Sequence, residues 1–386
     1  TTNPITSYIA RQLYGKELKN SVSRLETFAR CAYAHFLQYG MKLKEREGFE
    51  FEAVDLGNIF HNVLEIFSNT LEENETDWLH FTKEQADKWI EQAVEEQSVL
   101  YKDSVLYSSA RNRYAILRMI RVLKKTVLSL QRQLQKGMFT PKRFEMGFRK
   151  NLLSSKENPD LNMSIQGRID RIDTYETDEK VYVKVMDYKS GNKKFDVVSF
   201  YYGLQLQLVV YMEQAIEKVK REKRDKQIVP AAMLYYTVKD PLVKGQQLSE
   251  EELMNLMDKE LVMRGLVNYD EDICTLLDED LSKASTSSKV ISVATDKNGN
   301  YKSGSELCST EEFEKLSTYV NKKMQEIGNK IWQGDIEKKP YKKADTTGCT
   351  YCAYKGVCGF DERLNGYEMR NITISEEKAM EEIMSD

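Results

Sequence analysis

The segment VMDYKSG follows an alternating apolar run and ends it with charged residues. Side chains two positions apart on a β-strand point to the same face of the sheet. The face that carries Val183 and Val185 therefore continues to Asp187 and then to Lys189. Burying a charge is costly unless the charge is paired or binds a metal. The pattern indicates a reactive site, with a solvent-facing Asp–Lys pair at a strand end as the alternative.

A second pair of acids lies upstream, in the segment GRIDRID, which offers Asp170 and Asp173 on a strand that we expect beside the first. Two carboxylates on adjacent strands can hold a hard divalent cation such as Mg²⁺, which prefers oxygen ligands. A lysine nearby can orient or deprotonate a metal-bound water, or stabilise charge on a phosphate. These residue types fit metal-assisted hydrolysis of a phosphodiester.

Two helices are expected to add polar groups to these strands. In LGNIFHNVLE, Gly57, His61 and Glu65 recur at intervals of four and share one helix face. In LQLQLVVYM, Gln207 and Tyr211 have the same spacing. Each set alone is more typical of an ordinary helix contact. Beside the acids, they predict that His61 reaches the metal and that Gln207 and Tyr211 bind a phosphate or orient the lysine.

Four elements in this order resemble the RecB-like branch of the PD-(D/E)XK nuclease superfamily. The branch carries G-x-x-x-H-x-x-x-E, G-x-x-D, D-x-K and Q-x-x-x-Y, matched here by Gly57–His61–Glu65, Gly167–Asp170, Asp187–Lys189 and Gln207–Tyr211. The resemblance implies that Asp170 and Asp187 ligate one or two Mg²⁺ ions with help from His61, and that Lys189 activates the water. It implies supporting contacts of Gln207 and Tyr211 with DNA or the lysine. Asp173 is not expected as a ligand, because the motif uses the first aspartate after the glycine.

Cysteines crowd near the end of the chain, where CTYCAYKGVC contains Cys349, Cys352 and Cys358. Clustered cysteines in a chain without an export signal are typical of a metal site rather than of disulfides. Cys31, in FARCAYAHF, is the natural fourth ligand. Four thiolates suit zinc or an iron–sulfur cluster, and the residues alone do not separate the two.

One cysteine before the nuclease motifs and three after them resemble the order found in nucleases with a [4Fe–4S] cluster. SVSRLETFARCAYAHFLQYGMKLKERE is similar to the segment with the first cysteine in the AddB family of bacterial helicase–nuclease subunits, and the similarity runs from about residue 20 to about 366. The resemblance implies a [4Fe–4S] staple on Cys31, Cys349, Cys352 and Cys358 that closes a long loop. It also implies the subunit AddA as partner, and trimming of the 5′-ended DNA strand during double-strand break repair.

Residues 111–150 hold twelve Lys or Arg and a single acid. On the expected helix, an apolar stripe is formed by Ile116, Ile120, Leu123, Val127, Leu130 and Leu134. The opposite face carries Arg111, Arg118, Arg121, Lys125, Arg132 and Lys136. A solvated face ordinarily mixes charges of both signs, so this basic stripe indicates a DNA-binding surface, with a plain solvated face as the alternative.

The elements that must position these residues form a mixed α/β pattern. We expect a restriction-endonuclease-like core sheet of the PD-(D/E)XK type, flanked by helices. Helices are predicted over 20–47, with Ser23 as N-cap and Glu26 three residues later, and over 53–73, 82–136, 199–222 and 309–333. Strands are predicted over 143–149, 163–175, 180–189 and 229–238, and an irregular region over about 265–305.

The expected organisation is an N-terminal extension (1–20), a stapled nuclease domain (21–366) and a C-terminal tail (367–386). Within the nuclease domain we expect a helical part over about 21–140, the core over about 141–240, an irregular and helical part over about 241–340, and the cysteine-rich segment over 341–366.

Composition narrows the class of protein. The 386 residues carry a net charge of -4 and 41% hydrophobic side chains, enough for a sizeable core. We see no apolar run that could span a membrane and no signal-peptide pattern, so we expect a cytoplasmic protein. The motif G-x-x-x-x-G-K-[ST] does not occur, and Lys16 in YGKEL does not complete one, so we expect no ATPase in this chain.

The sequence therefore predicts a Mg²⁺-dependent deoxyribonuclease, the exonuclease domain of a helicase–nuclease. Two alternatives stay open. One is a DNA-end-binding module with a vestigial nuclease motif, which the intact Asp170, Asp187 and Lys189 disfavour. The other is a CRISPR-associated iron–sulfur nuclease, a class whose chains are usually much shorter.

Overall fold

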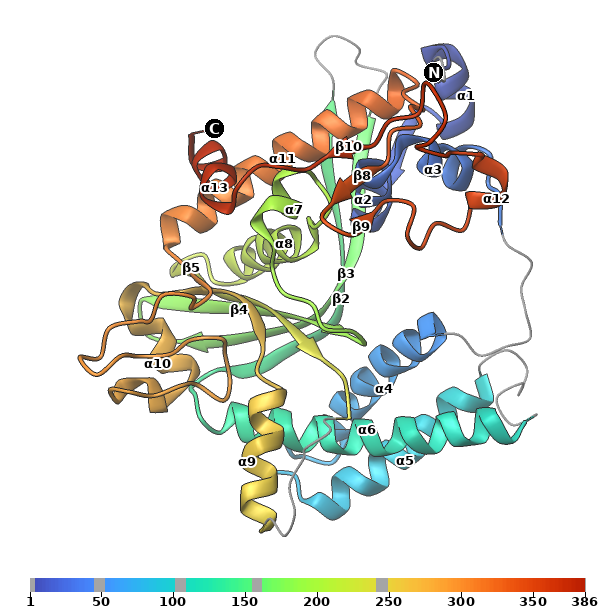
Figure 1. The fold of residues 1–386 in the computed structure, drawn as a ribbon. Coiled ribbons are helices and arrows are strands. Elements are labelled where there is room, and N and C mark those ends of the chain that lie inside the picture. The colour runs from blue at the N-terminus through green and yellow to red at the C-terminus, as the bar shows by residue number, and fades with distance from the viewer. Residues whose placement is uncertain (1–3, 45–52, 101–108, 155–161, 241–248, 386) are drawn as a thin grey trace.

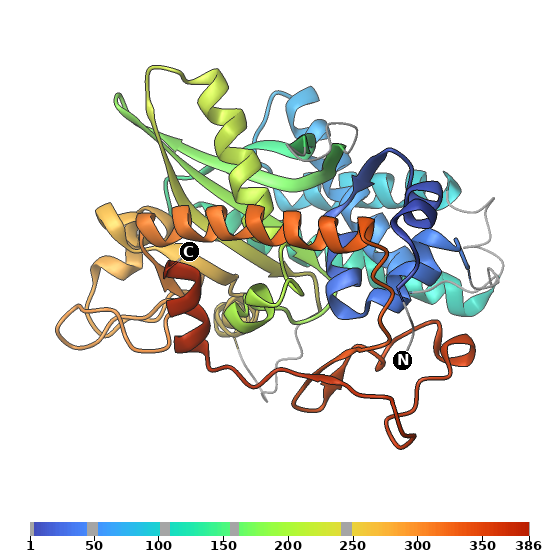
Figure 2. The ribbon, with the colours of Figure 1, turned by 90° about the horizontal axis from the view of Figure 1, so that it is seen from above.

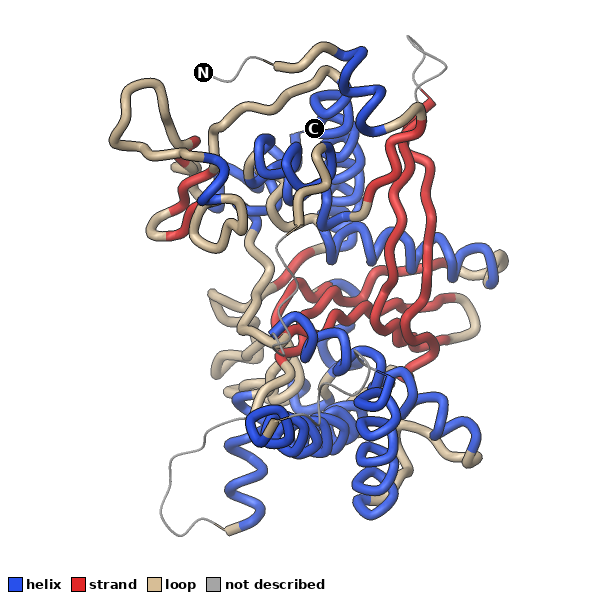
Figure 3. Tube along the Cα trace, turned by 90° about the vertical axis from the view of Figure 1, so that its right-hand side faces the viewer, coloured by secondary structure: helices blue, strands red, loops and turns tan. Residues whose placement is uncertain are grey.

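A computed structural model of the chain describes residues 4–44, 53–100, 109–154, 162–240 and 249–385. A mixed sheet lies at the centre, with helices on both of its faces (Figures 1 and 3). This confirms the expected mixed α/β class, because each face of the sheet is buried against helices. Within the described ranges, no helix combines the length and the apolar character needed to cross a membrane.

The central sheet has seven strands, in the order β1-β3-β4-β5-β6-β7, with β2 paired to β3. They are β1 (Glu17–Asn20), β2 (Thr140–Ser154), β3 (Asn162–Glu176), β4 (Lys180–Lys189), β5 (Gln227–Thr237), β6 (Arg264–Asn268) and β7 (Leu307–Cys308). The long β3 pairs with β2 along one edge, and along the other it pairs first with β1 and then with β4. β4 is therefore an interior strand, which explains its nearly unbroken burial.

One face of the sheet is covered by α2 (Val22–Arg30), α8 (Gln207–Glu222) and α11 (Thr310–Trp332). Their apolar side chains pack with the β4 residues Val181, Val183 and Val185, as the alternation predicts. Seen from above, α11 runs across the sheet (Figure 2). The shorter helices α1 (Ser7–Tyr14), α7 (Val197–Tyr201) and α13 (Glu376–Ser385) contact this layer at its margins.

The other face is covered by α4 (Ala53–Glu73), α5 (Lys83–Leu100) and α6 (Ala110–Leu134). The predicted apolar stripe of α6 packs into this layer, with Ile120 partly buried and the other five side chains buried. Two further helices lie later in the chain, α9 (Glu250–Glu260) and α10 (Ile273–Leu277).

The cysteine-rich end forms a small unit beside α2 and α3 (Ala32–His35) (Figure 1). Its elements are β8 (Tyr341–Lys343), β9 (Thr346–Thr347), α12 (Lys355–Cys358) and β10 (Arg370–Asn371), whose strands pair in the order β10-β8-β9. Residues from both ends of the chain therefore lie side by side, although the core separates them in sequence.

The helix predicted over 20–47 is wrong at its start and in its continuity. Ser21, not Ser23, is the N-cap of α2, and its hydroxyl accepts the N–H of Arg24. The helix stops at Cys31, whose φ of -167° and ψ of 115° are extended, and α3 starts at the next residue. A π-helical turn follows, and residues 45–47 of the prediction lie outside the described residues.

Two other predicted helices are each divided. The span 82–136 contains α5 and α6, and its residues 101–108 lie outside the described part of the chain. The span 199–222 is interrupted after α7, where Gly203 has a φ of 78° and a Cβ would lie 3.3 Å from the Cβ of Ala29 in α2. A left-handed residue packed this closely favours glycine and ends the helix there.

A buried ion group holds β3 and β4 together under the α4–α6 layer. Arg171 Nε lies 2.6 Å from Asp173 Oδ1, and Lys184 Nζ lies 2.7 Å from Asp173 Oδ2. Burial raises the pKa of Asp173, but the charges of Arg171 and Lys184 outweigh it and hold this pKa below its ordinary value. Asp173 therefore binds Arg171 and Lys184 in the core, and the sequence analysis did not expect it to be a metal ligand.

We predict that Asp173→Asn lowers the free energy of unfolding by about 3–5 kcal/mol, because it leaves two buried cations without their shared counter-charge. Urea unfolding measures this change. Asp361→Asn, which removes the partner of the exposed Arg363, is the matched control and should leave the urea midpoint in place. A native midpoint for Asp173→Asn would contradict the prediction.

Candidate active site

Three carboxylates occupy one row across β2, β3 and β4. In β2 and β3, the paired residues Phe144–Arg171 and Met146–Ile169 flank Glu145 and Asp170, so these two acids lie opposite each other. The ladder between β3 and β4 starts at Arg171, and its next rung would join Asp170 to Asp187. Residues directly opposite each other in antiparallel strands point to the same face. The sheet therefore gathers three acids at the point where β3 and β4 separate.

The side chain of Asp170 accepts a backbone hydrogen bond from β4 where the β3–β4 ladder ends. Its Oδ2 accepts the backbone N–H of Tyr188 at 2.7 Å, and the residue is 6% exposed. Burial and the nearby charge of Asp187 raise the pKa of Asp170 well above its ordinary value. Repulsion between carboxylates of this kind is relieved by a proton or by a bound cation.

His61 reaches the row from α4. Its Nδ1 lies 3.2 Å from Asp170 Oδ2 and 3.3 Å from Glu145 Oε1. Burial lowers the pKa of His61, but the hydrogen bond to Glu145 and the charge of Asp170 raise it more, so that it ends above its ordinary value. Ligand atoms of His61, Glu145 and Asp170 all lie within 4.8 Å of one another, a spacing that can hold a divalent cation.

Glu145 is the site residue that the sequence analysis missed. There it is only the single acid of a basic segment. Its φ of 46° lies in the left-handed region, which is strained for a residue with a side chain. Such strain persists where the surroundings impose it, and it clusters at functional sites. The missing information was the register between β2 and β3, which single-strand alternation does not provide.

Asp187 is buried and faces Lys189, whose Nζ lies 2.5 Å from Asp187 Oδ2. Neither oxygen of Asp187 receives a directed hydrogen bond from the described residues. Asp187 also lies outside the tight group of His61, Glu145 and Asp170. The Lys189 ammonium offsets the charge of this buried carboxylate but does not meet hydrogen-bond geometry with it, so the carboxylate oxygens stay unsatisfied, which is costly in free energy. The chemistry of Asp187 therefore fits a cation that it would share with Asp170.

α8 holds the lysine from the other side. Lys189 Nζ donates to Gln207 Oε1 at 3.1 Å, and Gln207 Nε2 donates to the Tyr211 hydroxyl at 2.9 Å. The structure thus brings Gln207 to Lys189, and Tyr211 reaches the lysine only through Gln207. Glu65 is the last residue of the α4 motif. Burial and the neighbouring charge of Glu145 raise the pKa of Glu65.

A cavity of 300 Å³ opens beside the row, between α4 and the ends of β4 and β5. Gly57, His61 and Lys189 are among the residues that line it. The cavity has room for a phosphate group, and it borders the acids through His61 and Lys189, which line it.

The predicted basic stripe is mostly paired. Four of its six cations have carboxylate partners from later in the chain: Arg121 and Lys125 pair with Asp240, Arg132 with Asp258, and Lys136 with Asp280. Arg111 and Arg118 are exposed and form no ion pair with another described residue. Among the described residues, the cations of this stripe that have no carboxylate partner therefore lie in the N-terminal half of α6, and a role of the stripe in DNA binding stays a prediction.

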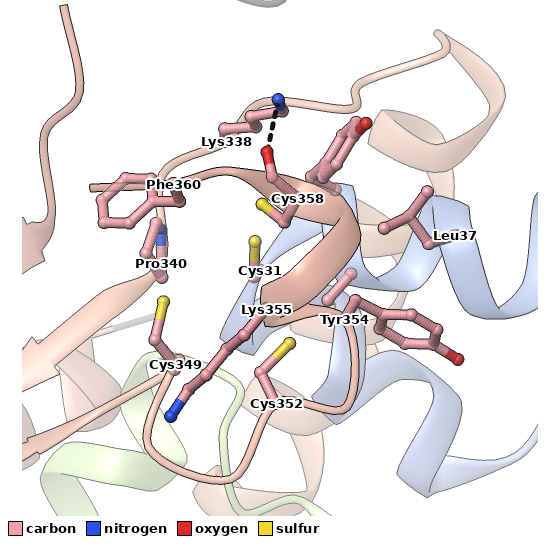
Figure 4. Close-up of a pocket in the computed structure, with 13 residues that line it drawn as sticks. Cys31, Leu37, Lys338, Pro340, Cys349, Cys352, Tyr354, Lys355, Cys358 and Phe360 are labelled. Atoms are coloured by element: carbon pink, nitrogen blue, oxygen red, sulfur yellow. Dashed lines mark hydrogen bonds between the residues drawn. The ribbon is translucent and has the colours of Figure 1, made fainter. Parts of the chain in front are cut away.

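Four cysteines line a second cavity, of 170 Å³ (Figure 4). Cys31 lies at the break between α2 and α3, and Cys349, Cys352 and Cys358 come from the cysteine-rich end. None of them forms a disulfide. Burial and the neighbouring cysteines raise the pKa of Cys349 to about 11. A group that holds four thiolates together must supply positive charge, as zinc and iron–sulfur clusters do.

A mixed sheet whose interior strand ends in Asp-x-Lys, beside a carboxylate of the neighbouring strand, defines a nuclease type of core. Comparison with known families agrees: the family model of the PD-(D/E)XK nuclease superfamily matches residues 19–359. The chain belongs to this superfamily, and the resemblance expected from the motifs is confirmed.

Curated relatives share one name, which designates the AddB subunit of an ATP-dependent helicase/deoxyribonuclease. The protein of Lachnoclostridium phytofermentans is 38% identical over 381 residues, which cover 97% of this chain and 32% of that protein. The protein of Caldanaerobacter subterraneus subsp. tengcongensis is 36% identical, with 95% and 32% covered, and that of Alkaliphilus oremlandii 32% identical, with 98% and 33% covered. The chain thus spans about a third of the length of these relatives.

We predict that Glu145→Gln weakens the binding of Mn²⁺ or Mg²⁺ by about tenfold or more, because a charged oxygen beside the cation is lost. Isothermal titration calorimetry on the folded variant measures this. Glu179→Gln, a change in the turn between β3 and β4, is the control and should bind the ion like the wild type. Wild-type affinity in Glu145→Gln would remove Glu145 from the site.

Proposed function

We propose that this chain is a Mg²⁺-dependent deoxyribonuclease domain that hydrolyses DNA phosphodiester bonds. The observation that carries the proposal is the meeting of Asp170 and Asp187 at the end of the β3–β4 ladder, with Lys189 2.5 Å from Asp187. Membership of the nuclease superfamily and the relatives' shared name support the reaction and the substrate.

Each residue of the site has a separate task in this proposal. Asp170 and Asp187 would hold the cation, with His61 and Glu145 beside them, and the chemistry that such an ion would supply is polarisation of the phosphate and a lower pKa of a bound water. Lys189, held by Gln207, places its ammonium where it orients that water and offsets charge on the phosphate. Tyr211 fixes the amide of Gln207, so that its carbonyl oxygen faces the lysine.

We further propose that the domain acts within a larger AddB-type subunit, as an exonuclease on the 5′-ended strand during double-strand break repair. The length of the relatives supports a larger protein, and their name supports a helicase–nuclease context. The partner would be an AddA helicase–nuclease subunit, the substrate single strands or duplex ends, and the place of action the cytoplasm.

Cleavage of end-labelled single-stranded DNA tests the reaction. We expect Mg²⁺-dependent cleavage by the wild type and a loss of at least about a thousandfold in Asp187→Ala, because the ion loses a ligand and Lys189 its partner. Circular dichroism should show a native fold for the variant. Labels at the 5′ and 3′ ends report strand polarity. Native cleavage by Asp187→Ala would refute the site.

We propose that Cys31, Cys349, Cys352 and Cys358 hold a [4Fe–4S] cluster. Their four thiols around one cavity support a four-thiolate site, and the order of the cysteines along the chain favours iron–sulfur over zinc. Such a cluster would tie the α2–α3 break to the cysteine-rich end and limit the freedom of both.

Anaerobically purified protein is expected to be brown and to contain about four iron and four sulfide per chain. Cys352→Ser should lose the iron and unfold at a lower temperature, because the staple is gone, whereas Cys274→Ser, at a buried cysteine away from the cavity, should keep its iron. A colourless wild type with one zinc per chain would contradict the cluster.

A further inference from the structure

α2 has a second link to the site besides its packing on the sheet. Glu26 lies in the middle of this helix, and its Oε1 accepts the backbone N–H of Leu206 at 2.7 Å and that of Gln207 at 3.3 Å. These two N–H groups belong to the start of α8. The carboxyl group of Glu26 in α2 therefore accepts hydrogen bonds from backbone N–H groups at the start of α8.

α8 lacks a cap of its own. Its N-cap residue is Leu206, whose side chain has no oxygen to accept the free N–H groups of the first turn. Glu26 fills this role from outside the helix, where its carboxyl oxygen meets the positive end of the helix dipole. The beginning of α8 is consequently fixed to α2 rather than by its own sequence.

Gln207, whose backbone Glu26 holds, is also the residue that contacts Lys189. Gln207 is the first residue of α8, and its Oε1 accepts the Lys189 ammonium at 3.1 Å. A shift of the first turn of α8 would move Gln207, and with it the ammonium beside Asp187. Glu26 thus holds the backbone of Gln207 and of the residue before it, and the side chain of Gln207 contacts Lys189.

The C-terminal end of α2 is held by contacts with the cysteine-rich end of the chain. Arg370, from the cysteine-rich end, donates to the carbonyl oxygen of Ala29. Gly348 packs so closely that a Cβ there would lie 2.9 Å from the carbonyl oxygen of Arg30. The next residue is Cys31, which faces the cysteine cavity.

We propose that Glu26 is a positioning residue for the reaction: it caps α8 from α2 and thereby sets Gln207 and Lys189 against Asp187. The inference rests on the proposed nuclease function. Glu26 does not line the substrate cavity. Its hydrogen bonds go to the start of α8 and it lies within charge interaction of Lys189, so it acts on turnover through the placement of Gln207 and Lys189 and not on DNA binding.

The test measures kcat and KM for Mg²⁺-dependent DNA cleavage by the full-length protein, with any subunit that accompanies it. Glu26→Ala removes the acceptor, and kcat should fall about tenfold to a hundredfold with KM unchanged, as expected for a small misplacement of a catalytic group. Glu26→Gln keeps an oxygen acceptor and should restore most of kcat. Glu26→Asp keeps the charge but withdraws it by one methylene, and should lower kcat even if Glu26→Ala does not fold.

Ser309→Ala is the matched control, because it removes the N-cap of α11, a helix end that makes no hydrogen bond to the site. It should lower the unfolding temperature comparably and leave kcat unchanged. In a double-mutant cycle, Glu26→Ala should add nothing to the kcat loss of Gln207→Ala, because the two act in series.

Wild-type kcat in a folded Glu26→Asp or Glu26→Ala protein would overturn the proposal, as would a fully additive cycle or an equal loss in Ser309→Ala. Failure of the nuclease function looks different. In that case the wild type does not cleave DNA with Mg²⁺, or Asp187→Ala cleaves it equally well.

Discussion

Carboxylates repel one another strongly where water is scarce, and Glu145, Asp170 and Asp187 share one row of a buried sheet. The arrangement is costly in free energy: burial first, and then the charge of Asp187, raise the pKa of Asp170. A divalent cation bound between these carboxylates would remove their repulsion and would be attracted by all of them. The rest of the structure can be understood as the means of holding this row in place and keeping Lys189 beside it.

Each strand of the row is fixed by a different device. β4 is an interior strand with helices on both faces, so Asp187 has little freedom. β3 is tied to β4 by the buried ion group of Asp173, three residues along β3 from Asp170. β2 holds Glu145 in a left-handed conformation. From the helical layers come His61 on α4 and Gln207 on α8, so the two layers meet at the site from opposite faces of the sheet.

Local patterns were sufficient for much of this arrangement. The bounds of β4 and α4 agree with the predicted 180–189 and 53–73, because alternation and helical spacing are properties of short segments. The pairing of β3 with β4, and with it the meeting of Asp170 and Asp187, followed from two adjacent strands joined by a short turn.

Features that depend on distant partners were not accessible in this way. Glu145 joins the site only through the register of β2, and Asp240 neutralises Arg121 and Lys125 from more than a hundred residues away. The break at Cys31 was also missed, since SRLETFARCAYAHF has continuous helical spacing. There the packing against the cysteine-rich end overrides a local preference for helix.

The most direct measurement of the central claim is anomalous diffraction from a crystal soaked in Mn²⁺, which scatters anomalously and takes the oxygen ligands of Mg²⁺. We expect a peak bonded to carboxylate oxygens of both Asp170 and Asp187, within reach of His61 and Glu145. A peak that touches neither aspartate, or no peak at an Mn²⁺ concentration that supports DNA cleavage, would contradict that claim.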